Sequence, residues 1–292
     1  MIYGAIDLGG TNIRVAFIDS SLKILDSVRE PSVKGNKEAL LLQIVRLLKT
    51  LMDRHPECGV KYVGISAAGF FENGIIKLSP NLYIKDFDLI SGLKMAFPAL
   101  SFRAANDANC SALIEALEGA GKPYSSVYFI TVSTGIGVGL VVDKKLVDLP
   151  FETGHSYLGY KGGYYGLEDL CSGTGIVRLA SMNHVNVAST KDFFDLVRSD
   201  VADVLPVYRD WISLLASSIA NAQLAFNTEV TVLSGGVMKS KDVFLKDLEK
   251  RTNDFLKLYP VRPVKFVEGR FLQDTGLYGG LAEALALEKE GR

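Results

Sequence analysis

Two glycine-rich segments of the chain contain residue types that suit the binding of phosphate. The first, residues 7–12, reads Asp-Leu-Gly-Gly-Thr-Asn and follows an apolar run. Backbone N–H groups at Gly9, Gly10 and Thr11 can point at phosphate oxygens. Asp7, at the entrance of the turn, can hold a hydrated Mg²⁺ beside them. A plain hairpin turn, in which the glycines supply positive φ angles, is the alternative.

The second segment, residues 133–137, reads Ser-Thr-Gly-Ile-Gly and also follows an apolar run. Two such turns in corresponding positions favour phosphate binding over the hairpin interpretation, since both can contact one nucleotide. A further pair, Gly235 and Gly236, could allow the close approach of a flat ligand such as adenine. A simple turn remains an open alternative for that pair.

Asn106 and Asp107 stand where a predicted strand ends and a helix begins. An Asp at such a position is often only an N-cap. The chemical interpretation is a carboxylate that accepts a proton from a hydroxyl as that oxygen attacks a γ-phosphate. A helix N-terminus stabilises the ionised form of this base. Asn106 could bond to neighbouring hydroxyls of the acceptor.

Glu152, His155 and Glu168 form a third group of polar side chains. Two carboxylates and an imidazole suit hydrogen bonding to adjacent sugar hydroxyls, because carboxylates accept and an imidazole can donate. A solvated loop is the alternative. A zinc site would need further ligands, and no cysteine lies between His155 and Cys171.

The elements that must position these groups alternate between strands and helices. Strand patterns run over residues 2–6, 13–18, 62–66, 102–105, 127–132 and 230–233, and helical patterns over residues 38–55, 110–117, 211–226 and 277–287. This alternation predicts an α/β fold. The strand, glycine turn, strand plan of residues 2–18 recurs from residue 127, which indicates two duplicated α/β domains with a ligand site expected in an interdomain cleft.

Composition excludes several classes of function. Among 292 residues, 32 Lys and Arg stand against 33 Asp and Glu, so a net charge of -1 offers no field that would collect nucleic acid or an anionic membrane. No stretch reaches about 18 uninterrupted apolar residues, and no basic leader opens the chain. Three cysteines without C-x-x-C spacing favour a reducing, cytoplasmic location. The other histidines, His55 and His184, are expected to be surface residues.

Together these segments resemble the ROK family of sugar kinases, and the resemblance covers nearly the whole chain. It implies the two-domain fold of hexokinase, actin and Hsp70, with duplicated ribonuclease H-like domains. Residues 7–12 and 132–137 resemble the family's two phosphate motifs, and residues 106–109 resemble its catalytic segment. Residues 64–69 and 79–82 resemble segments that line the sugar pocket. Residues 152–155, and Glu168 before residues 172–175, resemble its sugar-binding motifs. We expect an N-terminal domain over residues 1–120 and a C-terminal domain over 121–274, with a last helix of about 275–292 packed back on the first.

The resemblance also implies a role for each site residue. Asp107 is the expected catalytic base, and Asp7 is the residue expected near Mg²⁺. The expected sugar ligands are Ser66, Asn81, Asn106, Asp107, Glu152, His155 and Glu168. The expected ATP-binding residues are Gly9, Gly10, Thr11, Asn12, Thr134, Gly135, Gly137, Gly235 and Gly236.

One segment departs from the family's pattern. Many members place a cysteine-rich zinc knuckle between the His and the later Glu, whereas residues 159–166 here read GYKGGYYG. Zinc is therefore not expected. A group of tyrosines is expected to hold the loop of His155 instead: Tyr157, Tyr160, Tyr164 and Tyr165.

We therefore expect an ATP-dependent hexose kinase that phosphorylates a sugar hydroxyl, most readily the 6-hydroxyl of glucose. Fructose, mannose and N-acetylmannosamine are alternative acceptors. A non-enzymatic sugar-binding or regulatory protein is the alternative from another class. The family's regulators carry a helix-turn-helix domain before the first phosphate motif, and a motif that starts at residue 7 leaves no room for one. The resemblance is also compatible with a homodimer.

Overall fold

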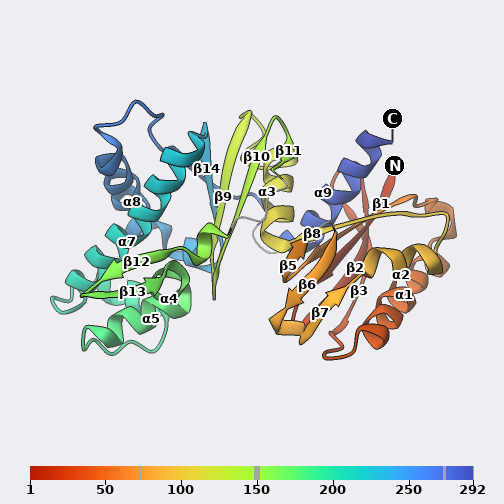
Figure 1. The fold of residues 1–292 in the computed structure, drawn as a ribbon, viewed down its shortest axis with the longest axis horizontal. Coiled ribbons are helices and arrows are strands. Elements are labelled where there is room, and N and C mark those ends of the chain that lie inside the picture. The colour runs from red at the N-terminus through yellow and green to blue at the C-terminus, as the bar shows by residue number, and fades with distance from the viewer. Residues whose placement is uncertain (73, 148–151, 272–273, 292) are drawn as a thin grey trace. The chain divides into compact units, whose positions relative to one another are not determined.

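The computed structural model describes residues 1–72, 74–147, 152–271 and 274–291, and position 292 of the expected last helix lies outside them. The chain divides into two compact units (Figure 1). The first unit contains residues 1–117 and 274–291, and the second contains residues 118–147 and 152–271. The C-terminal segment therefore belongs to the same unit as the N-terminus.

The first unit is built on a five-stranded sheet in the order β3-β2-β1-β4-β8. Its strands are β1 (Ile2–Leu8), β2 (Asn12–Asp19), β3 (Ile24–Pro31), β4 (Tyr62–Ala67) and β8 (Ser101–Asn106). Strand β1 is antiparallel to β2 and parallel to β4, which is parallel to β8. The carboxyl ends of three parallel strands therefore lie at one end of the sheet, where open α/β sheets bind ligands.

Helices cover both faces of this sheet, because its side chains alternate between two separate apolar clusters. The helices are α1 (Lys37–Arg54), α2 (Leu89–Ala96), α3 (Asp107–Glu118) and α9 (Thr275–Glu290). Ile6 and Leu8 of β1 belong to the cluster that α1 and α2 complete. Tyr3 and Ala5 of the same strand pack with α9 on the other face.

Smaller elements complete the first unit. Strands β5 (Phe70–Glu72), β6 (Ile75–Ser79) and β7 (Ile84–Phe87) form an antiparallel sheet. A short helix, η2 (Pro80–Leu82), joins β6 to β7 and carries Asn81. Another, η1 (Pro56–Cys58), follows α1.

The second unit repeats the plan of the first. Its sheet has the order β11-β10-β9-β14-β15, with β9 (Ser126–Val132), β10 (Ile136–Val142), β11 (Lys145–Leu146), β14 (Val230–Ser234) and β15 (Phe266–Glu268). As in the first unit, the central strand is antiparallel to the strand that follows it and parallel to a later one. This shared topology confirms the duplicated α/β fold expected from the sequence.

Helices α4 (Leu167–Cys171), α5 (Gly173–Met182), α6 (Thr190–Arg198), α7 (Val204–Phe226) and α8 (Lys241–Leu256) pack around one large core in the second unit. Phe194, Trp211 and Phe244 come from three of these helices and pack with ring centroids 5.3–5.6 Å apart. The remaining elements are η3 (Thr153–His155), η4 (Gly236–Ser240) and the hairpin of β12 (Tyr157–Tyr160) and β13 (Gly163–Gly166).

The strands and helices expected from the sequence are present. Strand β1 and helix α7 are both longer than expected. Strand β1 continues to Leu8, so Asp7 is a strand residue and not part of a turn. Helix α7 begins at Val204 instead of Trp211. Pro206 lies in its first turn, where the missing N–H costs no hydrogen bond. Within the described residues, no helix combines the length and apolar character that crossing a bilayer requires.

Candidate active site

Polar residues of the expected site gather at the carboxyl ends of neighbouring strands in the first unit. Asp7 of β1 lies in register beside Ser66 of β4. Asn106 is the last residue of β8, opposite Ala67, and Asp107 begins α3 directly after it. The register of the sheet thus brings Asp7, Asn106 and Asp107 to the same end of one layer.

The carboxyl group of Asp7 is largely enclosed and has both acidic and basic neighbours. Burial raises its pKa to about 6, and repulsion from Asp107 and Asp274 contributes to the increase. Arg14 opposes the increase, although it is also paired with Asp274 at 2.7 Å. Gly276 of α9 packs against the group, because a Cβ there would lie 2.3 Å from the Asp7 Cγ. A cation would relieve the repulsion among these carboxylates, so the residues fit a hydrated Mg²⁺ near Asp7.

The first glycine turn depends on close packing and not on unusual backbone angles. The turn does join β1 and β2 as an antiparallel hairpin, but neither Gly9 nor Gly10 has the positive φ that the hairpin interpretation gave as the reason for its glycines. A Cβ at Gly10 would lie 2.4 Å from the Cβ of Asn81. The N–H of Gly9 donates to the carbonyl oxygen of Asn12 at 3.0 Å and is used within the turn. Gly10 and the exposed Thr11 remain as candidates for binding phosphate.

Asn106, and not Asp107, caps helix α3. The Oδ1 of Asn106 accepts hydrogen bonds from the N–H groups of Ala108 at 2.9 Å and Asn109 at 3.3 Å. Its Nδ2 donates to the carbonyl oxygen of Gly69 at 2.8 Å. Both polar atoms of Asn106 therefore already have partners, and a sugar hydroxyl would have to share them.

Asp107 is left as the first helical residue, and its side chain is exposed. Desolvation by the surrounding protein nevertheless raises the pKa of its carboxyl group, while the hydrogen bond that it accepts from the N–H of Ala108 at 2.9 Å opposes that increase. Solvent access matters more for a proposed reaction, because it allows a substrate hydroxyl to reach the carboxylate.

Ser66 does not fit the expected role of sugar ligand. Its side chain is fully buried, because β4 is a central strand that helices cover on both faces. The hydroxyl lies against the thiol of Cys110, and a Cβ at Gly279 would be 3.3 Å from it. Ser66 therefore packs α3 and α9 onto the sheet.

In the second unit, an acidic side chain closes the second glycine turn. The Oε2 of Glu168 accepts a hydrogen bond from the N–H of Ile136 at 2.8 Å. A Cβ at Gly135 would lie 2.4 Å from that oxygen. On the other side, the Oγ1 of Thr174 donates to the carbonyl oxygen of Thr134 at 2.8 Å. Segments 30 to 40 residues away thus hold the turn in shape.

Glu152 directly precedes the short helix η3 and His155 is its last residue, and both are exposed. The hydroxyl of Thr153 forms a hydrogen bond of 3.1 Å with that of Tyr128 on β9. Helix α4, which carries Glu168, packs against η3. The three expected sugar ligands of this unit therefore come from elements in mutual contact.

The tyrosine hairpin that follows η3 matches its expected role only in part. The hydroxyl of Tyr160 donates to the Oδ2 of Asp210 at 2.8 Å, and Tyr165 also packs against the core. Tyr157 and Tyr164 are 78% and 83% exposed. The expectation that all four tyrosines hold the loop is therefore wrong for these two.

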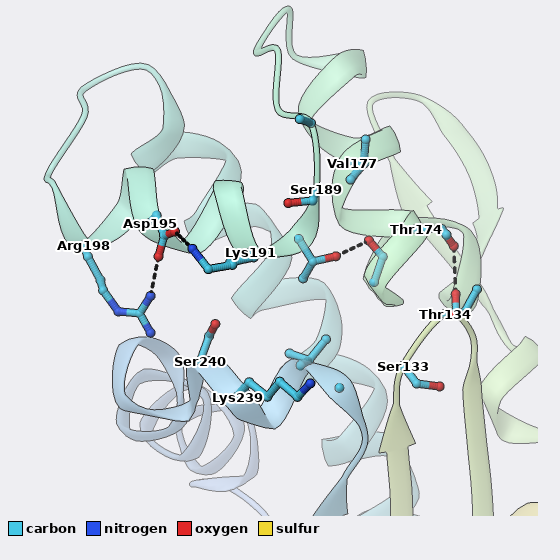
Figure 2. A pocket seen from close by; sticks show the side chains of 15 residues that line it. Ser133, Thr134, Thr174, Val177, Ser189, Lys191, Asp195, Arg198, Lys239 and Ser240 are labelled. Carbon is cyan, nitrogen blue, oxygen red and sulfur yellow. Dashed lines mark hydrogen bonds and ion pairs between the residues drawn. The ribbon is translucent and has the colours of Figure 1, made fainter. Parts of the chain in front are cut away.

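A cavity of about 850 Å³ lies within the second unit, beside the second glycine turn (Figure 2). This volume is typical of small-molecule sites. Six hydroxyl side chains line it: Ser133, Thr134, Thr174, Ser189, Thr190 and Ser240. On one side, Asp195 pairs with Lys191 at 2.5 Å and with Arg198 at 2.8 Å. The cavity can therefore offer hydrogen-bond donors and acceptors to a polar ligand.

Of the three glycines Gly137, Gly235 and Gly236, which were expected to bind nucleotide, only Gly236 lines the cavity. Gly236 lines the cavity, and a Cβ there would meet no atom within 4 Å. Gly235, which follows β14, has a φ of 95° that favours glycine, and a Cβ there would lie 2.3 Å from the carbonyl oxygen of Val132. Gly137 lies in β10 opposite Thr131 and is not among the residues that line the cavity.

Sequence reasoning missed the charged residues of the cavity. Lys191 and Arg198 lie on α6 and Lys239 on η4, and no local motif links the two elements. His55 was also misjudged as an isolated surface residue. It is half-buried, and its Nε2 lies 3.0 Å from the Oδ2 of Asp26, 29 positions away in the sequence.

Comparison with known proteins connects these features to one family. The ROK family model matches residues 3–289. A glucokinase of Halalkalibacterium halodurans is 29% identical, and the match covers 95% of this chain and 93% of that protein. An N-acetyl-D-glucosamine kinase of Haemophilus influenzae is also 29% identical, with 81% and 84% covered. The crystal structure of a ROK hexokinase from Thermus thermophilus is 26% identical, with a TM-score of 0.85 over 100% of both chains.

Proposed function

Because the chain belongs to the ROK family, we propose that it is an ATP-dependent hexose kinase that transfers the γ-phosphoryl group to a sugar hydroxyl, most readily the 6-hydroxyl of glucose. One observation carries this proposal: the exposed carboxylate of Asp107 stands at the same sheet end as Asp7 and the first glycine turn. A carboxylate at that place can take the proton of an attacking hydroxyl while the turn holds the phosphates.

Phosphate binding is proposed for the first unit and nucleoside binding for the second, each from the residues of that unit alone. In the first unit, the N–H groups of Gly10 and Thr11 are the proposed donors, because that of Gly9 is used within its own turn. In the second unit, the cavity beside Thr134 would hold the nucleoside, with Gly236 against the flat base and hydroxyl side chains near the ribose.

Asp7 would hold Mg²⁺ through water. When bound, the ion would neutralise charge on the phosphoryl oxygens. Asp107 accepts the proton of the sugar hydroxyl at its exposed carboxylate. Asn106 fixes the start of α3 and so keeps Asp107 in position.

Asn81, Glu152, His155 and Glu168 are the proposed sugar ligands. A glucokinase and an N-acetyl-D-glucosamine kinase are equally similar to the chain, at 29% identity, so the test covers both of their sugars. Mannose, fructose and N-acetylmannosamine are included with these two sugars in the test.

The test measures ATP consumption with each sugar of this panel, for the wild type and for Asp107→Asn. We expect sugar-dependent consumption that is fastest with glucose, and a fall in kcat of ~10²- to 10⁴-fold in the variant with both ligands still bound. Asp53→Asn, which changes an exposed Asp on α1, is the matched control and should keep wild-type kcat. Sugar binding without ATP consumption would establish the non-enzymatic alternative, and normal turnover in Asp107→Asn would remove that residue from the mechanism.

A further inference from the structure

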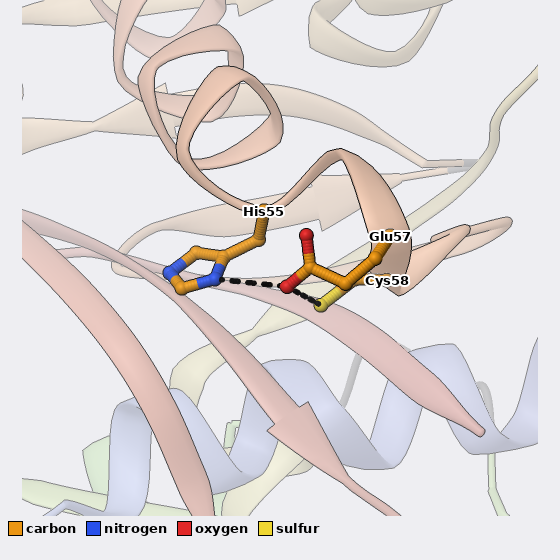
Figure 3. A group of neighbouring side chains, drawn as sticks. All are labelled: His55, Glu57 and Cys58. Carbon is orange, nitrogen blue, oxygen red and sulfur yellow. Dashed lines mark hydrogen bonds and ion pairs between the residues drawn. The ribbon is translucent and has the colours of Figure 1, made fainter.

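The end of helix α1 brings together three side chains of types that bind transition metals, outside the proposed active site. His55 follows the helix, and Glu57 and Cys58 lie in η1 (Figure 3). The three potential ligand atoms, an imidazole nitrogen, a carboxylate oxygen and a thiol sulfur, lie within 4.8 Å of one another. In the part of the chain that the structure describes, no second group of this kind is found.

Two of the three separations of these atoms approach those of a tetrahedral site, and the third is at most 4.8 Å. The Oε1 of Glu57 lies 3.4 Å from the Nδ1 of His55 and 4.0 Å from the Sγ of Cys58. Ligands bound to Zn²⁺ at about 2.0 to 2.3 Å are separated from each other by about 3.3 to 3.7 Å. Small side-chain rotations would therefore bring the three atoms around one ion.

A carboxylate from another element orients the imidazole. The Nε2 of His55 lies 3.0 Å from the Oδ2 of Asp26 on β3. When Nε2–H donates to that carboxylate, the lone pair is on Nδ1, which is the nitrogen on the side of Glu57. Metal-binding histidines usually have such a partner on the other ring nitrogen. The ring also packs against Phe17, with centroids 6.3 Å apart.

We propose that His55, Glu57 and Cys58 bind a divalent transition-metal ion, with Zn²⁺ as the best match and water as the fourth ligand. Thiolate and imidazole favour Zn²⁺, whereas Mg²⁺ prefers oxygen ligands. On binding, a bond forms between the ion and the Cys58 sulfur, and the thiol proton passes to the buffer. Through Asp26, the ion would connect the end of α1 to β3. This site is independent of the proposed kinase activity.

The experiment titrates the full-length protein, freed of metal with EDTA and dialysed, with Zn²⁺ alone in a calorimeter. We expect one strongly bound ion per chain, which excess Mg²⁺ does not displace. Cys58→Ser should lower the affinity at least 100-fold, and Glu57→Gln, at an exposed position, at least tenfold. Asp26→Asn should lower it ~10- to 100-fold although Asp26 does not touch the ion. Co²⁺ in place of Zn²⁺ should give a thiolate charge-transfer absorption that Cys58→Ser abolishes.

His184→Asn is the matched control. It removes an exposed histidine elsewhere, at a positive φ of 60° that Asn tolerates, and should leave Zn²⁺ affinity unchanged. The proposal is overturned if the wild type binds no stoichiometric Zn²⁺, or if Cys58→Ser and Glu57→Gln bind it as well as the wild type. If Cys58→Ser does not fold, Glu57→Gln decides the result alone.

Discussion

Glu168 accepts a hydrogen bond from the backbone N–H of Ile136 at 2.8 Å, so a proposed sugar ligand also forms part of the second glycine turn. The bond fixes the backbone of the second glycine turn at Ile136. It also joins α4 to the hairpin of β9 and β10. Substitutions at Glu168 are therefore expected to change the binding of both ATP and sugar, and not of the sugar alone.

Glu168→Ala should weaken ATP binding and sugar binding together. It leaves the N–H of Ile136 without its carboxylate partner, which costs the folded turn about 1.5 to 3 kcal/mol. A turn that no longer holds its shape should bind ATP at least ~10-fold more weakly. Glu168→Gln keeps an oxygen acceptor for that N–H, so its affinity for ATP should stay within ~2- to 3-fold of wild type while its KM for sugar rises. Calorimetric binding of ATP and steady-state kinetics measure the two effects. Unchanged ATP affinity in Glu168→Ala would show that the bond does not shape the turn.

Gly10→Ala should abolish most activity through packing. The new Cβ would lie 2.4 Å from the Cβ of Asn81, so the turn and η2 must separate. Gly159→Ala, on the exposed hairpin where a Cβ meets nothing within 4 Å, is the matched control. We expect a fall in kcat/KM of ~100-fold or more for the first variant and less than ~2-fold for the second. Equal activity of the two variants would mean that the turn tolerates displacement.

Val177→Phe tests whether the cavity of the second unit holds the nucleoside. Val177 lines the cavity, so the larger ring should fill part of the space and raise the KM for ATP ~10-fold or more, with sugar affinity unchanged. Val142→Phe, at a position 41% exposed on β10, is the control for the added ring and should keep the wild-type KM. Normal ATP affinity in Val177→Phe would place the nucleoside elsewhere.

Asp7→Asn should change the pH dependence of stability. Burial raises the folded-state pKa of Asp7 from 3.8 to about 6. The folded state therefore holds this proton more tightly than the unfolded chain does. The resulting stabilisation is complete below pH ~4 and is lost as the pH rises through 6. The isosteric, uncharged Asn avoids that loss.

We therefore expect the variant and the wild type to have similar free energies of unfolding at pH 4. At pH 7 to 8 the variant should be more stable by up to about 3 kcal/mol, at about 1.4 kcal/mol per pKa unit. Denaturant unfolding in EDTA across this pH range measures the difference. A difference that does not vary with pH would contradict the raised pKa.

Much of the fold could be predicted from sequence because its signals are local. The apolar runs before residues 7–12 and 133–137 predict strands, and the glycines after them predict turns. Two occurrences of the same plan predicted the duplication that the sheet orders confirm. Helix ends were less predictable, as the start of α7 at Val204 shows, because the packing of its first turns decides them.

The amino-acid sequence by itself determined which residue types stand at the strand ends: Asp7, the glycine pairs, Asn106 and Asp107. Only the tertiary structure decided how each of them is used. In the folded chain Asn106 caps α3, and Ser66 is buried in the interior. Glu168 accepts a hydrogen bond from the second glycine turn. The tertiary structure also pairs His55 with Asp26. The physical reason is the same in each case: burial and hydrogen bonding join residues far apart in the chain, and only packing determines those partners.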